Sequence, residues 1–276
     1  FLPNLMYKNS KITLKDILFD SNDAKYDAIT SQDVPQTIAT KLTDNATKPY
    51  IILTDWLYIG NRFHAKERES LIKLGITHIL NITQDIPNYF HDIISYANIK
   101  IHDFDDTIIS DYFVAAWKFI DLCNPNISNN KNNKILVHCS MGISRSSTII
   151  ISYLMSKHIN DIIINKQDIK LLNDIRNELN SYQNSKKIKI KKYDIYNIND
   201  DNNDTILTFA EAYEYVRLRR SVICPNFGFV RQLIDLEKNY CKKTTCILVS
   251  RFRNNPKFNK MLRSNNINGY CTGECI

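Results

Sequence analysis

The chain has 276 residues, of which 43 % are hydrophobic and 24 % are charged. This composition suffices to bury a sizeable core in one or two domains and excludes a wholly disordered chain. No stretch approaches the roughly 18 consecutive apolar residues of a membrane-spanning helix, and the N-terminus lacks the basic-then-apolar layout of a secretory signal. We therefore expect neither a membrane protein nor a secreted precursor.

The formal net charge of +7 belongs to the C-terminal part of the chain. Residues 49–156 carry nine basic and ten acidic side chains, whereas residues 217–276 carry twelve and three. A near-neutral central region does not favour nucleic acid as a partner, although the basic tail could dock to acidic partners. Seven cysteines, an odd number, fit a reducing compartment better than a disulfide framework. We expect a cytoplasmic location, with the nucleus as a second one.

Residues 49–156 alternate between short apolar runs and helical periodicity. The apolar runs predict strands at residues 56–60, 76–82, 98–103 and 134–139. Helices are predicted at 65–75, ended by Gly75, and at 110–123, opened by Ser110. The second helix presents one apolar face formed by Phe113, Trp117 and Ile120. This alternation predicts an α/β domain in which helices flank a central, mostly parallel sheet.

The remaining segments differ in character from this block. Residues 159–204, rich in Asn, Asp, Lys and Ile, indicate a polar insertion. Within it, only residues 169–179 favour a short helix, and the lysine run at 186–192 is expected to form a solvated edge. Helical spacing returns at 207–222 and again after Asn226, which is placed to cap the last helix. We therefore divide the chain into the N-terminal extension 1–48, of unassigned role, a domain at 49–240 and a basic tail at 241–276.

An apolar strand, a loop from Cys139 to Arg145 and a helix follow one another directly in residues 134–151. Unpaired amides at a helix start and the helix dipole favour an anion, so a loop curled there can hold a phosphate. Gly142 allows a backbone conformation that a side chain would hinder, and Arg145 can bind two phosphate oxygens. The same features favour the thiolate of Cys139, a nucleophile, over the alternative of a buried structural thiol.

The run HCSMGISRSS, starting at His138, resembles the His-Cys-x5-Arg-Ser/Thr signature of cysteine-dependent protein phosphatases. Its surroundings resemble the dual-specificity group of these signalling enzymes. Further matches are Trp56-Leu-Tyr-Ile-Gly, Ser110-Asp-Tyr-Phe, Glu211-Ala-Tyr-Glu-Tyr-Val, Arg219-Arg220, Pro225-Asn226-Phe-Gly-Phe and Gln232-Leu. The resemblance covers residues 49–158 and 205–240. It implies a single cysteine-phosphatase domain that dephosphorylates phosphotyrosine and phosphoserine/threonine on proteins, without a cofactor or metal.

The resemblance also implies a role for each signature residue. Cys139 attacks phosphorus and forms a phosphocysteine. The phosphate oxygens are held by Arg145 and by the backbone amides of Ser140, Met141, Gly142, Ile143 and Ser144. His138 orients the loop and helps to keep Cys139 ionised, and Ser146 hydrogen-bonds the sulfur as it departs. An upstream Asp supplies the proton for the leaving oxygen: alignment of the aromatic pair at 112–113 favours Asp103, while Asp105 and Asp106 remain alternatives.

The variable positions of the loop, Ser140, Met141, Ile143 and Ser144, carry no charge, unlike those of the phosphoinositide phosphatases of this superfamily. No phosphotyrosine-recognition loop precedes residue 76, so a shallow pocket for a phosphorylated protein is expected. Two alternatives remain: a pseudophosphatase that binds phosphoproteins without turnover, and an RNA 5′-triphosphatase. Zinc is a less favoured hypothesis than free thiols for the tail cysteines, which are Cys241, Cys246, Cys271 and Cys275.

Overall fold

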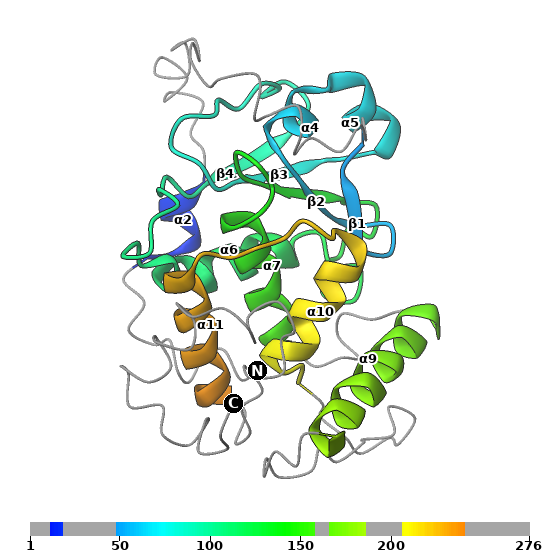
Figure 1. Ribbon diagram of the computed structural model, residues 1–276. Helices are drawn as coiled ribbons and strands as arrows, with labels where there is room; N and C mark the ends of the chain where they lie inside the picture. The colour runs from blue at the N-terminus through cyan, green and yellow to red at the C-terminus, as the bar shows by residue number, and fades with distance from the viewer. Residues whose placement is uncertain (1–11, 19–47, 158–165, 186–205, 241–276) are drawn as a thin grey trace, which may run out of the picture.

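The computed structural model describes residues 12–18, 48–157, 166–185 and 206–240. Five strands form one sheet in the order β1-β2-β5-β3-β4 (Figure 1). Their bounds are β1 Tyr50–Leu53, β2 Leu57–Gly60, β3 His78–Asn81, β4 Ser95–Asn98 and β5 Ile135–His138. Strand β1 is antiparallel to β2, and the other three pairings are parallel. The predicted α/β fold with a mostly parallel sheet is therefore confirmed.

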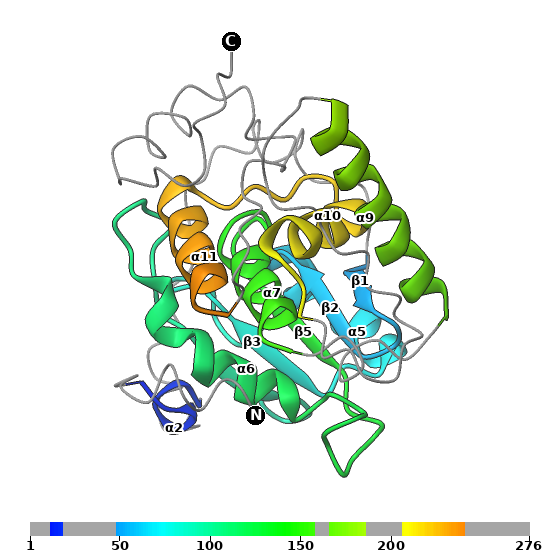
Figure 2. The same cartoon turned by 90° about the horizontal axis from the view of Figure 1, so that it is seen from below.

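Helices cover both faces of the sheet. On one face lie α6 (Phe113–Asp121), α7 (Arg145–Met155), α10 (Phe209–Arg219) and α11 (Phe227–Tyr240), as Figure 2 shows. The other face carries α4 (Arg62–Lys66) and α5 (Arg68–Leu74). Alternation along β2 sends Leu57 and Ile59 into the larger apolar cluster and Tyr58 into the smaller one. Among the described helices, none is both long and apolar enough to cross a membrane.

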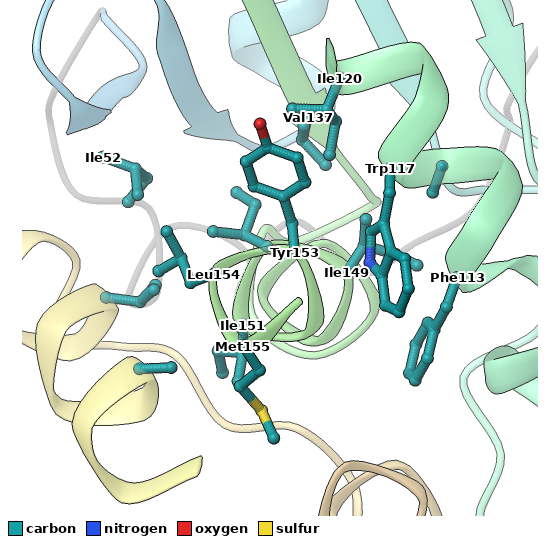
Figure 3. Packing of buried hydrophobic residues seen from close by; sticks show 14 of the residues in the cluster. Ile52, Phe113, Trp117, Ile120, Val137, Ile149, Ile151, Tyr153, Leu154 and Met155 are labelled. Atoms are coloured by element: carbon teal, nitrogen blue, oxygen red, sulfur yellow. The ribbon is translucent and has the colours of Figure 1, made fainter. Parts of the chain in front are cut away.

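Helix α7 forms the centre of the larger cluster, and all of its residues are buried. Aromatic side chains pack around it (Figure 3): Phe113 stacks on Trp117, and the Trp117 Nε1–H donates to Ser152 Oγ at 3.0 Å. Phe113, Trp117 and Ile120 are all buried, as their shared helix face predicts. A helix held on every side fixes the position of its own N-terminus, where the signature loop ends.

Four predicted elements differ from the observed ones, and β1 was not predicted. The helix expected at 65–75 is two helices. Helix α4 begins earlier, after Asn61, whose side chain accepts two amide hydrogen bonds, and the non-helical backbone of Glu67 separates α4 from α5. Gly75 does end α5, with φ 73°. The helix expected to open at Ser110 begins only at Phe113, after the 3-10 turn η2 (Ile109–Tyr112). The Ser110 amide instead donates to the side chain of Gln232 at 2.9 Å.

The strand expected at 98–103 is placed too late. Strand β4 ends at Asn98, and the last bond that continues its ladder runs from the Ile99 amide to the Asn81 carbonyl, 2.9 Å. Beyond this point the chain leaves the sheet, and its polar groups bind the signature loop instead. This departure delivers the segment 101–108 to the site.

The helix of the insertion is also longer than predicted: α9 (Lys166–Ser185) has 20 residues and packs against α10. Leu172 is fully buried, and Arg176 Nε lies 2.5 Å from Glu211 Oε1 in an ion pair that is almost fully buried. In the N-terminal segment, α2 (Leu14–Ile17) packs against α6. Part of each segment thus belongs to the folded core, while the division at 48 and 240 stays a prediction. The lysine run and the tail lie outside the described residues.

Candidate active site

The signature loop runs from the end of β5 at His138 to the start of α7 at Arg145. Cys139 is buried at its base, with 1 % of its surface exposed. Its sulfur accepts a hydrogen bond from the Gly142 amide at 3.2 Å and lies 3.3 Å from the Ser146 hydroxyl. The sulfur thus accepts from one backbone amide and lies within hydrogen-bond distance of one hydroxyl. This is the geometry that the nucleophile hypothesis requires.

The loop carbonyls from 140 to 144 are all bound from outside the loop or from α7. The Ser140 carbonyl accepts from the Arg62 amide at 3.1 Å. The carbonyls of Met141 and Gly142 accept from Arg220, at 3.1 Å from Nη2 and 2.8 Å from Nε.

The last two carbonyls of the loop follow the same pattern. The Ile143 carbonyl accepts from the Cys224 amide at 2.8 Å, and the Ser144 carbonyl from Thr148. A peptide plane whose carbonyl is held on one side presents its amide to the other side. Apart from the Gly142 amide, which donates to the Cys139 sulfur, the loop amides are thereby left for an anion, as in helix-start phosphate sites.

Gly142 has φ 68°, in the left-handed region, as predicted. A Cβ atom at this position would lie 2.4 Å from the Gly60 carbonyl oxygen at the end of β2. Both the backbone conformation and the close approach therefore require glycine here.

Arg145 is a buried cation that lacks a full set of partners. It is 8 % exposed, and its Nη1 donates to the Ile101 carbonyl at 3.0 Å. Its Nε lies 3.7 Å from Asp103 Oδ2 and has no hydrogen-bond partner among the described residues. Because buried donors are nearly always paired, a buried guanidinium with a free N–H is suited to receive an anion.

Of the three candidate acids, Asp103 is the one that reaches the loop. Its Oδ1 accepts from Ser144 Oγ at 2.6 Å and from Asn226 Nδ2 at 2.8 Å. All three residues are exposed, but among the described residues the carboxylates of Asp105 and Asp106 form no hydrogen bond or ion pair. The geometry favours Asp103, and its role as acid stays a prediction.

His138 supports the loop as a neutral side chain. Burial, together with nearby His64 and Arg145, lowers the pKa of His138 to about 4. Its Nδ1–H donates to the carbonyl oxygen of Cys139 at 3.3 Å. An uncharged imidazole orients the loop but adds no positive charge beside the sulfur, so the structure favours only the first of its two expected roles.

Two residues that the site uses were not predicted to belong to it, although Asn226 was predicted to cap the last helix and does so. Arg220 holds two loop carbonyls, and Asn226 holds the Asp103 carboxylate while its Oδ1 also caps α11 at the Phe229 amide, 2.9 Å. Both stand in C-terminal motifs that carry the family resemblance, so the signal was present, but the contacts span 78 residues for Arg220 with Gly142 and 123 residues for Asn226 with Asp103. Within the described residues, no group of three His, Cys, Asp or Glu side chains is arranged to hold a metal ion. The four tail cysteines lie outside the described residues.

Comparison with known proteins agrees with this geometry. Residues 57–163 match the family described as "Dual specificity phosphatase, catalytic domain". The chain is 31 % identical over 182 residues to dual specificity protein phosphatase 4 of Homo sapiens, with 66 % of this chain and 33 % of the relative covered. It is 30 % identical over 182 residues to dual specificity protein phosphatase 1-A of Xenopus laevis, with 66 % and 35 % covered.

The chain spans about a third of the length of the curated relatives it matches. Among solved structures, the human tyrosine phosphatase-like serine/threonine/tyrosine-interacting protein is 26 % identical, with a TM-score of 0.47 over 71 % of this chain and 99 % of that one. The signature, the loop that it folds into and the family match agree in identifying a dual-specificity phosphatase catalytic domain in residues 57–163.

Proposed function

We propose that this chain is a protein phosphatase that hydrolyses phosphotyrosine and phosphoserine/threonine through a phosphocysteine intermediate. The observation that carries the proposal is the convergence of three groups on one loop. Cys139 holds its sulfur between two donors, Arg145 keeps an unpaired buried N–H, and Asp103 lies beside both Ser144 and Arg145. Nucleophile, anion holder and proton donor are the three parts that phosphoryl transfer to a thiolate needs.

In the first step the Cys139 thiolate forms an S–P bond while the bond from phosphorus to the ester oxygen breaks. The loop amides and Arg145 stabilise the charge on the three remaining oxygens of the phosphoryl group. Asp103, protonated at the start, gives its proton to the departing alcohol or phenol oxygen.

In the second step a water oxygen forms the new bond to phosphorus and the S–P bond breaks. Asp103, now a carboxylate, takes a proton from the water, and the sulfur leaves as a thiolate. Ser146 Oγ, 3.3 Å from the sulfur, can donate to this thiolate as it forms. Inorganic phosphate is released, and both residues return to their starting protonation states.

The character of the site supports a monophosphorylated protein residue as substrate. The loop side chains from 140 to 144 are uncharged, so additional phosphates would find no further cation in the loop. Phe104, which is 60 % exposed, stacks with His102 on the segment that carries Asp103. An exposed aromatic side chain beside the acid is suited to contact a phosphotyrosine ring or an apolar neighbour. We propose the cytoplasm as the location of this activity.

The test is hydrolysis of an aryl phosphate by the wild type and by Cys139→Ser, without added metal and with vanadate as inhibitor. We expect activity that vanadate inhibits and that Cys139→Ser abolishes. Activity that survives Cys139→Ser would refute the proposal. An inactive wild type that still binds a phosphopeptide would indicate a phosphoprotein-binding module instead.

A panel of phosphotyrosine, phosphoserine and phosphothreonine peptides, set against RNA with a 5′-triphosphate, assigns the substrate. Turnover of all three peptides and not of RNA is expected. Preference for the RNA would identify a 5′-triphosphatase and contradict the proposed substrate.

A further inference from the structure

The segment that carries Asp103 lies on the first turns of α11. Three contacts join them: Asn226 Nδ2 donates to Asp103 Oδ1 at 2.8 Å, Gln232 Nε2 donates to the Thr107 carbonyl at 2.9 Å, and Gln232 Oε1 accepts from the Ser110 amide at 2.9 Å. They extend along the segment from its carboxylate to its far end. The proposed function gives these contacts no role.

Gly228 sets how closely the segment approaches α11. A Cβ atom at this position would lie 1.8 Å from the carbonyl oxygen of Asp105 and 2.8 Å from its Cα. Both neighbours are backbone atoms, which cannot rotate away as a side chain can. Because non-bonded heavy atoms need roughly 3.5 Å, a methyl group here would push the segment back by about 1–2 Å.

Asn226 fixes the carboxylate itself. Oδ1 of Asp103 is occupied by two donors, Ser144 Oγ and Asn226 Nδ2. The proton that Asp103 transfers is therefore carried on Oδ2, which is the oxygen 3.7 Å from Arg145 Nε. Asn226 also donates its backbone N–H to Ser144 Oγ at 3.1 Å, so one residue orients both partners of the acid.

We propose that the first turns of α11 position the general acid: Asn226 turns the protonated oxygen of Asp103 toward the phosphoryl site, and Gly228 lets the acid segment approach closely enough. The inference rests on the proposed function. Asn226 and Gly228 are positioning residues, since neither touches the reacting atoms. The acid is thus held in place before the substrate binds, which lowers the entropy cost of proton transfer.

Leaving-group dependence separates this role from a general weakening of the site. Dinitrophenyl phosphate releases a phenolate that leaves without a proton. Phenyl phosphate releases a phenol with a pKa near that of tyrosine, about 10, and needs the acid. The ratio kcat/KM reports only the step that forms the phosphocysteine and not the later step in which Asp103 takes a proton from water. A misplaced acid therefore lowers kcat/KM only for phenyl phosphate, whereas a damaged phosphate loop lowers it for both esters.

The variants are Gly228→Ala and Asn226→Ser, with Asp103→Asn as the reference for complete loss of the acid. Alanine suits a helix better than glycine, and serine keeps an oxygen that can cap α11, so both variants are expected to fold. Because a displacement of about 1 Å can cost about 10²-fold, we expect kcat/KM on phenyl phosphate to fall about 10²-fold and kcat/KM on dinitrophenyl phosphate less than about 3-fold. Asp235→Ala, which removes an exposed ion pair with Lys238 on the same helix, is the matched control and should change neither.

Amide hydrogen exchange over residues 103–107 provides a readout that needs no turnover. Exchange should be faster in Gly228→Ala than in the wild type and in Asp235→Ala, because the segment is no longer docked. The inference would be overturned if kcat/KM fell equally for both esters or for neither. Unchanged amide exchange over residues 103–107 in Gly228→Ala would also overturn it. If the wild type hydrolyses neither ester, the proposed function fails, and the exchange comparison still decides whether α11 holds the segment.

Discussion

Replacement of Arg220 is the sharpest test of how the loop is held. Arg220 is 2 % exposed, its guanidinium donates to the carbonyls of Met141 and Gly142, and it lies over the Tyr50 ring at 4.6 Å. Arg220→Met keeps the apolar stem and removes both hydrogen bonds. Hydrogen bonds from a charged donor contribute about 1.5–3 kcal/mol each, so the free energy of unfolding should fall by about 3–6 kcal/mol.

The catalytic effect of Arg220→Met follows from the peptide planes that Arg220 holds. With two carbonyls free to turn inward, the corresponding amides no longer face the phosphate, and loss of one such donor costs about 10²–10³-fold in kcat. We expect kcat/KM for an aryl phosphate to fall by about 10²-fold, with weaker inhibition by vanadate. Arg220→Lys, which can keep one of the two bonds, should lie between the wild type and Arg220→Met.

Arg219 offers a matched control. Its guanidinium lies 3.7 Å from the Tyr215 ring centroid and donates to the Tyr215 hydroxyl, away from the loop. Arg219→Met should lower stability modestly and leave kcat/KM and vanadate inhibition unchanged. The reasoning would be refuted if Arg220→Met kept wild-type kcat/KM, or if both methionine variants lost activity equally.

Three further predictions concern the acid, the loop histidine and the insertion. Asp103→Asn should lower turnover of phenyl phosphate by about 10²–10⁴-fold while phosphate binding persists, whereas Asp106→Asn should not, as measured by steady-state kinetics. The pKa of His138 is about 4 in the folded protein and about 6.5 in the unfolded chain. The free energy of unfolding, measured in urea, should therefore fall by about 3 kcal/mol in total as the pH falls from 6.5 to 4. Arg176→Ala leaves buried Glu211 unpaired and should cost about 3–5 kcal/mol of unfolding free energy.

Each of these has an internal control. His138→Asn keeps a donor for the Cys139 carbonyl but cannot titrate, so the pH dependence of unfolding should flatten. Lys238→Ala removes an exposed ion pair with Asp235 and should cost less than about 1 kcal/mol. Equal losses of unfolding free energy for Arg176→Ala and Lys238→Ala would show that α9 does not fold as part of the domain.

What the sequence could predict is local. The strand before Cys139, the left-handed conformation at Gly142 and the end of a helix at Gly75 each depend on neighbours within a few residues. Short apolar runs identified three of the five strands, and strand–helix succession predicted parallel pairing. Strand β1 was missed because its single antiparallel partner, β2, follows after a turn of only three residues that carries no glycine.

What the sequence could not predict depends on contacts between distant segments. The apolar run at 98–103 has the composition of a strand. However, the Ile101 carbonyl accepts a hydrogen bond from Arg145, and the Asp103 carboxylate accepts one from Ser144. A backbone carbonyl bound by a side chain from another element is not available to a neighbouring strand. The segment therefore binds the site instead of extending the sheet, and the local periodicity of its sequence cannot indicate this.

The signature residues are insufficient by themselves to make the site. Residues 139–145 contain the sulfur, the amides and the guanidinium, but three of the five loop carbonyls from 140 to 144 are held by Arg220 or by the Cys224 amide. The acid, in turn, is oriented by Asn226. One short motif supplies the nucleophile and the phosphate-binding groups. A segment 75 or more residues later sets the direction of the loop amides and of the Asp103 carboxylate. A phosphate loop of this kind can thus be disabled by substitutions at 220–228 that leave every signature residue in place.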